Sequence, residues 1–277
     1  MRIAVLSGKG GAGKTLVSVN LAALSPGSTY VDCDVEGPNG HLFFKPEDSV
    51  EEGVAVGVPV VDPDRCDGCR KCVEFCRFNA LAHVGGKLRV FEEVCHSCGG
   101  CMMVCPRKAI SEGEKAIGTI RKGTSGDVAV WSGFLNPGEP SGVPIIDALL
   151  GGLEGDGTVF VDSPPGSACV VMESIKDADY CVLVAEPTLF GTHNLAMVHE
   201  LVETFGKPFG VVLNKDQGGR NPAEEYCAEN GLTILGRIPF DAELARITSD
   251  AGIAVNEGGR FREMFSGLLE NVMGAVQ

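Results

Sequence analysis

Apolar residues along the chain alternate between short continuous runs and longer segments with helical spacing. The short runs are rich in Val, Ile and Leu, and they predict buried strands. They lie at residues 2–7, 28–33, 127–132, 158–163, 180–185, 209–214 and 232–238. Helical spacing lies between several of them, at 14–24, 192–205 and 222–230. Strands that are apolar on both faces are covered by helices on both sides, so the pattern predicts an α/β fold with a doubly wound, mainly parallel sheet.

The last segment, residues 259–277, has apolar side chains along one helical face. A helix that lies on a membrane surface would carry Lys and Arg on its polar face, but Glu263 and Glu270 occur there, mixed with two arginines. We therefore expect this helix to pack against the core. The acidic stretch at 47–52 is expected to be a solvated loop.

Length and charge narrow the classes of protein. The chain has 277 residues, which suits one α/β domain and a small module, and its net charge is −14. That charge disfavours nucleic acids and anionic membranes as partners. Met1 leads directly into the first strand and no apolar run reaches ~18 residues, so we expect a cytoplasmic protein without a membrane anchor. Without a secretory signal, its 12 cysteines predict reduced thiols with a metal or redox role.

A glycine-rich loop follows the first predicted strand and precedes the first predicted helix. It matches the phosphate-binding pattern G-x-x-x-x-G-K-[ST], and its members are Gly8, Lys9, Gly10, Gly11, Ala12, Gly13, Lys14 and Thr15. Glycines let backbone N–H groups turn toward phosphate oxygens, and the following helix directs its positive end at the same anion. We expect Lys14 to reach the β- and γ-phosphates and Thr15 to hold Mg²⁺.

The second lysine of this loop, Lys9, gives the sequence its resemblance to a known family. The chain resembles the MinD/ParA family of P-loop ATPases, which includes the nitrogenase iron protein and Mrp-type iron–sulfur carriers. The resemblance covers most of the chain outside the cysteine-rich middle. It implies that Lys9 crosses to the phosphates bound by a second copy, and hence an ATP-bound homodimer.

Further motifs match the same family. "VDCDVEGPN" at 31–39 resembles its first switch, which implies that Asp34 positions the attacking water and touches the Mg²⁺ shell, whereas Asp32 is structural. "TVFVDSPPG" at 158–166 places Asp162 at the Walker B position, so Asp162 is expected to bind Mg²⁺ directly or through water.

The choice of base follows from the segment that begins at Asn214. Related GTPases read N-K-x-D there, and the aspartate accepts bonds from guanine; here the fourth residue is Gln217. Asn214 can pair with adenine, and "RIPFD", which contains Pro239, resembles the adenine-flanking segment of the family. ATP is favoured.

Two cysteine runs occupy the middle of the chain, and both have the spacing C-x₂-C-x₂-C-x₃-C of bacterial ferredoxins. In that pattern the fourth cysteine of each run binds the other cluster. One 4Fe–4S cluster is then expected on Cys66, Cys69, Cys72 and Cys105. The other is expected on Cys95, Cys98, Cys101 and Cys76. Zinc would leave cysteines over, and disulfides suit neighbouring cysteines poorly.

These runs predict an inserted module. "CRFNAL" and "CPRKAI" are equivalent ends of two duplicated halves, with Arg77 where a proline is expected. We assign 61–113 to an inserted ferredoxin-like domain, and 1–60 with 114–277 to a discontinuous ATPase domain. The whole chain resembles a subgroup of the superfamily that carries such an insert, so the clusters are expected to respond when ATP reorders the first switch.

Outside the runs, Cys169 follows the second switch, near the place where the nitrogenase iron protein holds a cluster; a bridging or transient metal site there stays open. His96 lies within a cluster loop and is expected to be solvated.

We predict a slow, partner-stimulated ATPase that couples nucleotide state to low-potential electron transfer through two 4Fe–4S clusters to a redox partner. The alternative is a cluster carrier or assembly ATPase that serves an acceptor protein. A third, weaker reading is a MinD-like positioning ATPase.

Overall fold

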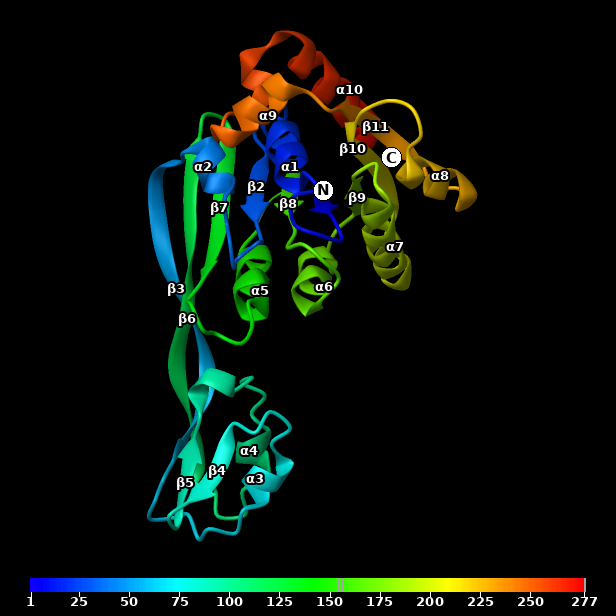
Figure 1. Cartoon of the computed structure of the whole chain (residues 1–277). Coiled ribbons are helices and arrows are strands. Elements are labelled where there is room, and N and C mark those ends of the chain that lie inside the picture. The colour runs from blue at the N-terminus through cyan, green and yellow to red at the C-terminus, as the bar shows by residue number, and fades with distance from the viewer. Residues whose placement is uncertain (154, 156, 277) are drawn as a thin grey trace.

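The computed structural model describes residues 1–153, 155 and 157–276, and Figure 1 shows two parts of unequal size. The larger part, here called the body, contains both termini. The smaller part, here called the cysteine module (residues 62–109), hangs from the body on two long strands.

Within the described residues, the body is built on a nine-stranded sheet with the order β11-β10-β9-β1-β8-β2-β7-β6-β3. Seven of these strands are the predicted ones, and they pair in parallel. Their bounds are Arg2–Leu6 (β1), Thr29–Asp32 (β2), Val128–Leu135 (β7), Val159–Asp162 (β8), Tyr180–Ala185 (β9), Phe209–Asp216 (β10) and Ile234–Pro239 (β11). The predicted α/β fold with a mainly parallel sheet is therefore confirmed.

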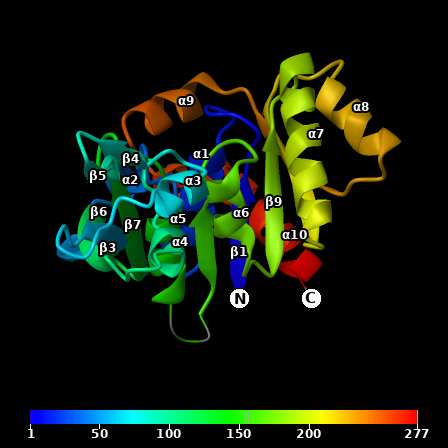
Figure 2. The same ribbon diagram turned by 90° about the horizontal axis from the view of Figure 1, so that it is seen from below.

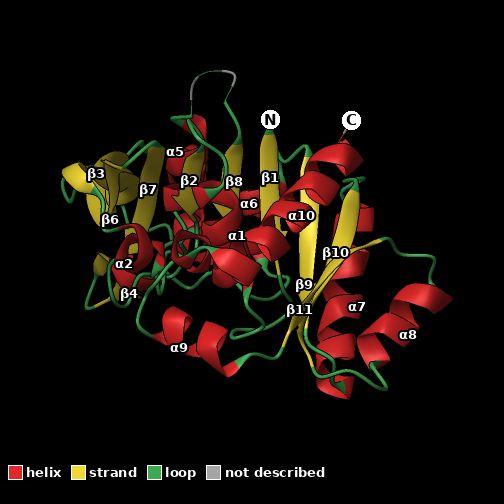
Figure 3. Ribbon diagram, turned by 90° about the horizontal axis from the view of Figure 1, so that it is seen from above, coloured by secondary structure: helices red, strands yellow, loops and turns green. Residues whose placement is uncertain are grey.

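Helices cover both faces of this sheet (Figure 3). Alternate residues of β1 show why: Ile3 and Val5 pack into one core, and Ala4 and Leu6 into the other. The first core is closed by α1 (Lys14–Ala23), α2 (Gly40–Phe44), α9 (Ala242–Ser249), a 3₁₀ turn (Ala254–Glu257) and α10 (Gly259–Val276). The second is closed by α5 (Val143–Gly151), α6 (Cys169–Ile175), α7 (Leu189–Thr204) and α8 (Pro222–Glu229).

The predicted C-terminal helix is α10, and its apolar face packs into the first core. Phe261, Phe265, Leu268 and Val272 are buried there. Among the described helices, none combines the length and the hydropathy that crossing a membrane requires.

Two antiparallel strands, β3 (Glu47–Val61) and β6 (Ile110–Ser125), complete the edge of the sheet and were missed by the sequence analysis. The expectation of a loop at 47–52 is wrong, because these residues begin β3. Their charges suit an edge strand, which must resist pairing with other chains. Arg121 and Lys122 on β6 form ion pairs with Glu51 and Glu52, so a stretch that looks like a solvated loop is held as a strand.

The far ends of β3 and β6 form a ribbon that carries the cysteine module. β6 runs antiparallel to β7, and Gly118 pairs with Leu135 at the carboxyl end of β7. Residues 110–117 and their partners on β3 therefore extend beyond the edge at which the parallel strands end. The module consists of α3 (Lys71–Phe75), β4 (Leu81–Val84), β5 (Lys87–Val90), a 3₁₀ turn (Glu92–Val94) and α4 (Gly100–Met103). Figures 1 and 2 place it below α5.

One lysine ties the ribbon to both parts. Lys115 of β6 forms an ion pair with Glu139 of the body at 2.8 Å, and its Nζ donates to the carbonyl oxygen of Glu92 in the module at 3.2 Å. Both charged side chains of the pair are largely shielded, with exposures of 18% and 11%. We call this arrangement the Lys115 bridge.

Candidate functional site

The glycine-rich loop joins β1 to α1 and lines a cleft of about 600 Å³. Gly11 and Gly13 have positive φ angles of 81° and 103°, which only glycine adopts easily. Gly13 also has no room for a side chain, because a Cβ there would lie 2.1 Å from Nδ2 of Asn214. Lys14 is buried and also lines the cleft. A cleft of this size suits a nucleotide.

Asp162 is buried at the end of β8, beside this loop. Its Oδ2 accepts hydrogen bonds from Oγ1 of Thr15 at 2.6 Å and from the hydroxyl of Tyr30 at 3.0 Å. Its Oδ1 is buried and has no hydrogen-bond partner among the described residues. Such an acceptor is costly unless something else binds it. The free oxygen and the adjacent Thr15 hydroxyl fit a hydrated Mg²⁺ ion, which prefers oxygen ligands.

The first switch contains two aspartates with different surroundings. The carboxylate of Asp32 accepts backbone N–H bonds from Asp34, Asn39 and Gly40, so it holds the turn after β2. Asp34 is half-buried and lines the cleft. Burial and the nearby charge of Asp162 raise the pKa of Asp32 to about 8. Burial also raises the pKa of Asp34 and of Asp162, while Lys14 opposes both shifts. The site thus gathers carboxylates that a bound cation would stabilise.

Lys9 makes an ion pair within its own chain, with Glu186 after β9. Its Nζ also lies 5.2 Å from the ring centre of Phe190. Lys215 binds the other oxygen of Glu186 at 2.5 Å and donates to the carbonyl oxygen of Gly11 at 2.8 Å. Burial alone would raise the pKa of Glu186, but its bonds with Lys215 and Lys9 hold that pKa below the ordinary value.

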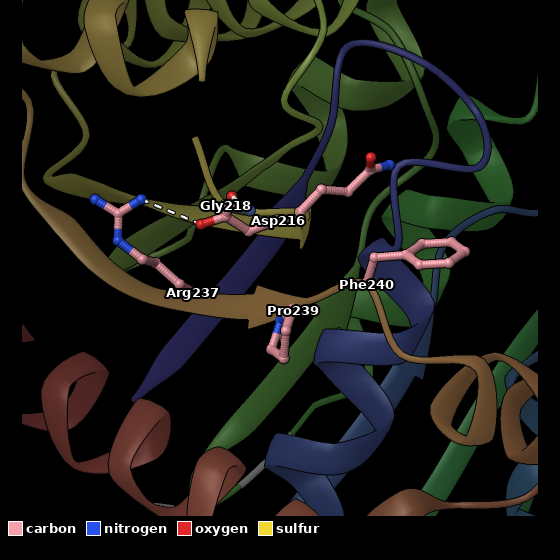
Figure 4. A pocket seen from close by; sticks show the side chains of 6 residues that line it. Asp216, Gly218, Arg237, Pro239 and Phe240 are labelled. Carbon is pink, nitrogen blue, oxygen red and sulfur yellow. Dashed lines mark hydrogen bonds and ion pairs between the residues drawn. The ribbon is translucent and has the colours of Figure 1, made fainter. Parts of the chain in front are cut away.

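Asn214 lies under the loop at the end of the cleft where a base is expected. It is buried, and its Nδ2 donates to the carbonyl oxygen of Ala12 at 2.7 Å. This bond fixes the amide, because a carbonyl oxygen accepts only from the nitrogen side. Its Oδ1 receives no hydrogen bond from the described residues. Pro239 and Phe240 line the same end and border a second hollow of about 580 Å³, where Arg237 binds Asp216 (Figure 4).

The eight cysteines of the two runs line two separate cavities in the cysteine module. The first cavity, here called the outer cavity, is lined by Cys66, Cys69, Cys72 and Cys105. The second, the inner cavity, is lined by Cys76, Cys95, Cys98 and Cys101, together with residues 57–59 of the ribbon. These are the two sets of four that the ferredoxin spacing predicts.

The two cysteine loops share a backbone shape that is rare. Gly68 and Arg70 in the first loop have φ angles of 72° and 65°, and the matched Ser97 and Gly99 have 52° and 69°. Positive φ is uncommon for residues other than glycine, so its repetition in both halves indicates a function. Successive turns of this kind direct N–H groups to one side, which suits an anionic group.

Four cysteine side chains at each cavity are a donor set that fits a 4Fe–4S cluster. Among the described residues, no group of three or more His, Cys, Asp or Glu side chains is placed to hold one metal ion. A zinc ion draws its ligands to within ~2.3 Å of the metal, whereas a cube of four irons receives one thiolate at each iron. Burial raises the pKa of the Cys72 and Cys101 thiols, and a metal would reverse that shift.

Two further residues named by the sequence analysis are Cys169, which lies apart from both cavities, and His96, which lines the inner one. Cys169 is exposed at the start of α6, and the described residues around it form no ligand group. His96 is exposed and stacks on Phe78 at 3.9 Å between ring centres. The sequence analysis missed Tyr30, Glu186 and Lys215, because only the fold brings these residues to the loop.

The fold and the loop define a nucleotide-binding protein of the P-loop class. The family model described as "CobQ/CobB/MinD/ParA nucleotide binding domain" matches residues 3–252, and the chain belongs to this family. The structure is similar to the cell division ATPase MinD of Pyrococcus furiosus, with a TM-score of 0.61 and 18% identity over 99% of this chain and 98% of that one. At this identity the likeness concerns the fold.

Relatives share more of the sequence. An uncharacterized protein of Methanocaldococcus jannaschii is 28% identical over 98% of this chain and 96% of its own length. A protein of that organism named iron-sulfur cluster carrier protein is 27% identical over 99% of this chain and 85% of its own. A ferredoxin of Pyrobaculum islandicum is 41% identical over 58 residues, 21% of this chain and 54% of the ferredoxin.

Proposed function

We propose that this protein is an ATP-hydrolysing iron–sulfur protein whose cysteine module holds two 4Fe–4S clusters and exchanges electrons under the control of the bound nucleotide. The observation that carries the proposal is the division of eight cysteines into two cavities of four beside a P-loop ATPase body. When bound, the clusters supply one-electron chemistry. We assign residues 61–113 to a ferredoxin-like insert, in keeping with the ferredoxin similarity.

The body is proposed to hydrolyse ATP with Mg²⁺. Lys14 and the loop N–H groups bind phosphates, Thr15 and Asp162 hold the metal, and Asp34 orients the attacking water. Adenine is favoured by the orientation of Asn214: its free Oδ1 accepts, which suits the amino group of adenine and repels the carbonyl oxygen of guanine.

Hydrolysis is proposed to be slow and stimulated by a partner protein, with an ATP-bound homodimer as the active form. Lys9 is the residue proposed to reach the second copy. Its present partner is Glu186, so dimerisation would exchange that carboxylate for a phosphate of the other protomer.

The names of the relatives favour a second function, cluster delivery to an acceptor protein. Four thiolates for each cavity favour resident clusters instead, because a cluster that leaves needs an open ligand position. Cys169, which is exposed and outside both cavities, is the residue that would serve a transferable cluster.

One set of measurements separates the two. The anaerobically purified chain is expected to hold about eight irons per chain and to show EPR signals that change with ATP and Mg²⁺. Incubation with an apo-ferredoxin is expected to move no iron, in wild type and in Cys169→Ala alike. Zinc in place of iron would contradict both functions, and iron transfer that Cys169→Ala abolishes would establish the carrier.

A further inference from the structure

The outer cavity contains a histidine that neither the nucleotide site nor the cysteine pattern explains. His83 lies on β4 and lines the cavity together with its four cysteines. Its Nε2 is buried and has no hydrogen-bond partner among the described residues. A buried nitrogen without a partner costs about 1–3 kcal/mol, so its position needs an explanation.

The surrounding chain is shaped to admit this imidazole. Gly68, between the first two cysteines of the loop, lies beside the ring, and an added Cβ there would lie 3.0 Å from Nε2. Gly68 also has a positive φ of 72°. The loop therefore leaves room for the ring edge beside the space that the four thiolates surround.

The duplicated half lacks this group. His83 follows Cys76 by the same number of residues as Glu112 follows Cys105, so Glu112 is its counterpart. Glu112 is exposed and lies against Gly57 at the edge of the inner cavity, and its side chain is not among those that line the cavity. His96, which does line the inner cavity, is exposed, so water can satisfy its nitrogens.

The other residues that line the two cavities also differ, because the outer cavity is more polar than the inner one. Arg70, Arg107 and Asp67 line the outer cavity, and Asp67 is ion-paired with Arg107 at 2.8 Å, so one cation, Arg70, is left in excess; Phe75, Phe78 and Met102 line the inner cavity. A reduced cluster carries more negative charge than an oxidised one, so donors and cations favour reduction and an apolar lining opposes it.

We infer that His83 donates a hydrogen bond from Nε2 to a sulfur of the cluster in the outer cavity, and that this bond helps to hold the outer cluster at a higher reduction potential than the inner one. The inference rests on the proposed function. It makes the module directional: a single electron resides on the outer cluster, at the end of the module away from the body.

The test is an EPR-monitored redox titration of the anaerobic full-length protein. Wild type is expected to reduce in two separate steps. His83→Leu, which has no donor, should lower the midpoint of the higher step and leave the lower one in place. His83→Gln, which keeps an N–H, should restore most of that midpoint, and the matched control Glu112→Gln should leave both steps unchanged.

Iron content distinguishes a failure of the proposed function from a failure of the role inferred for His83. A chain that binds no iron contradicts the proposed function and this inference together. Full iron with unaltered midpoints in His83→Leu overturns the role of His83 alone. If His83→Leu loses iron, pulsed EPR of wild type with ¹⁵N-labelled histidine decides: a nitrogen coupling to the higher-potential cluster that His83→Gln removes supports the inference, and its absence refutes it.

Discussion

The body and the cysteine module differ in how much apolar core supports their sites. In the body, two large apolar cores support the cleft, and Thr15, Tyr30 and Asn214 are already hydrogen-bonded around it. In the module the buried apolar cluster consists of Cys72, Leu81 and, from the start of the ribbon, Ile110; Ala80 and Ala109 are also buried, and several cysteines pack against the cluster. A core of that size cannot stabilise a domain without help. The nucleotide site is thus built by the chain, whereas the module depends on what its cysteines bind.

The largest expected effect comes from removing a cysteine at the centre of the module. Cys72→Ser should lose about half of the bound iron, because one of two clusters loses a ligand, and should expose the module backbone. Hydrogen exchange is expected to accelerate across residues 66–109 and to stay unchanged in the body. The matched control is Cys227→Ala, a buried cysteine of the body; equal protection of the module in both variants would contradict the contrast.

Lys14→Ala tests the nucleotide site of the body. The buried ammonium group is expected to stabilise charge on the transferred phosphoryl group, so ATP hydrolysis should fall about 100-fold or more. Iron content and the EPR signals without nucleotide should match wild type. Lys207→Ala, a lysine that binds carbonyl oxygens outside the cleft, serves as the control. Parallel loss of iron would show that the two parts are not independent.

Asp162→Asn should abolish hydrolysis and stabilise the metal-free body. Burial raises the pKa values of Asp32 and Asp162, and the charge of Asp162 adds to the shift of Asp32, so the folded chain holds protons that the unfolded chain releases. Its stability therefore falls as the pH rises from about 4 toward about 8. Replacing one of the two carboxylates with an amide should therefore prevent much of this fall in stability.

The corresponding measurement is thermal unfolding without Mg²⁺. The melting temperature of Asp162→Asn should exceed that of wild type, and the difference should be greater at pH 8 than at pH 5. A greater difference in melting temperature at pH 5 than at pH 8 would show that the pKa values of these carboxylates are not raised.

Asn214→Ala sharpens the view that the chain builds the nucleotide site in advance. Its amide donates to Ala12, so its loss leaves a buried carbonyl without a partner and costs about 1–3 kcal/mol. Part of this cost should appear as weaker ATP binding, and the preference for ATP over GTP should shrink. Calorimetry with both nucleotides checks this, and an unchanged preference would remove Asn214 from base selection.

The smallest effect is expected at the Lys115 bridge, where body and module meet. Lys115→Met should leave ATPase activity and iron content near wild type, because Lys115 lines neither the nucleotide cleft nor either cysteine cavity. What should decrease is the change that ATP causes in the EPR signals. Glu112→Gln on the same strand is the control, and an undiminished response would show that coupling uses another route.

The sequence predicted the parallel sheet, the loop and both sets of four cysteines because each depends on a local pattern. Buried parallel strands are apolar throughout, and the ferredoxin spacing itself divides the eight cysteines into the two groups of four that line the cavities. β3 and β6 were missed for the opposite reason. Glu51 and Glu52 resemble a loop until Arg121 and Lys122, far along the chain, are placed opposite them.

The same reasoning explains why other residues of the nucleotide site were not predicted. Tyr30 and Glu186 have no motif, and Lys215 belongs to the segment that begins at Asn214 but had no assigned role. All three reach the loop only through the order of strands in the sheet. The role of Lys9 in its own chain was also not predictable, because the resemblance concerns its place in a dimer.

The ribbon has a mechanical consequence. It pairs with β7 as far as Gly118, and beyond that point about seven residue pairs, or roughly 20 Å, lead to the module, with the Lys115 bridge as a side support. A small twist at the edge strand becomes a much larger sweep at the tip, as with any lever. A small reshaping of the sheet at the nucleotide cleft would in this way swing the whole cysteine module toward a facing surface or away from it.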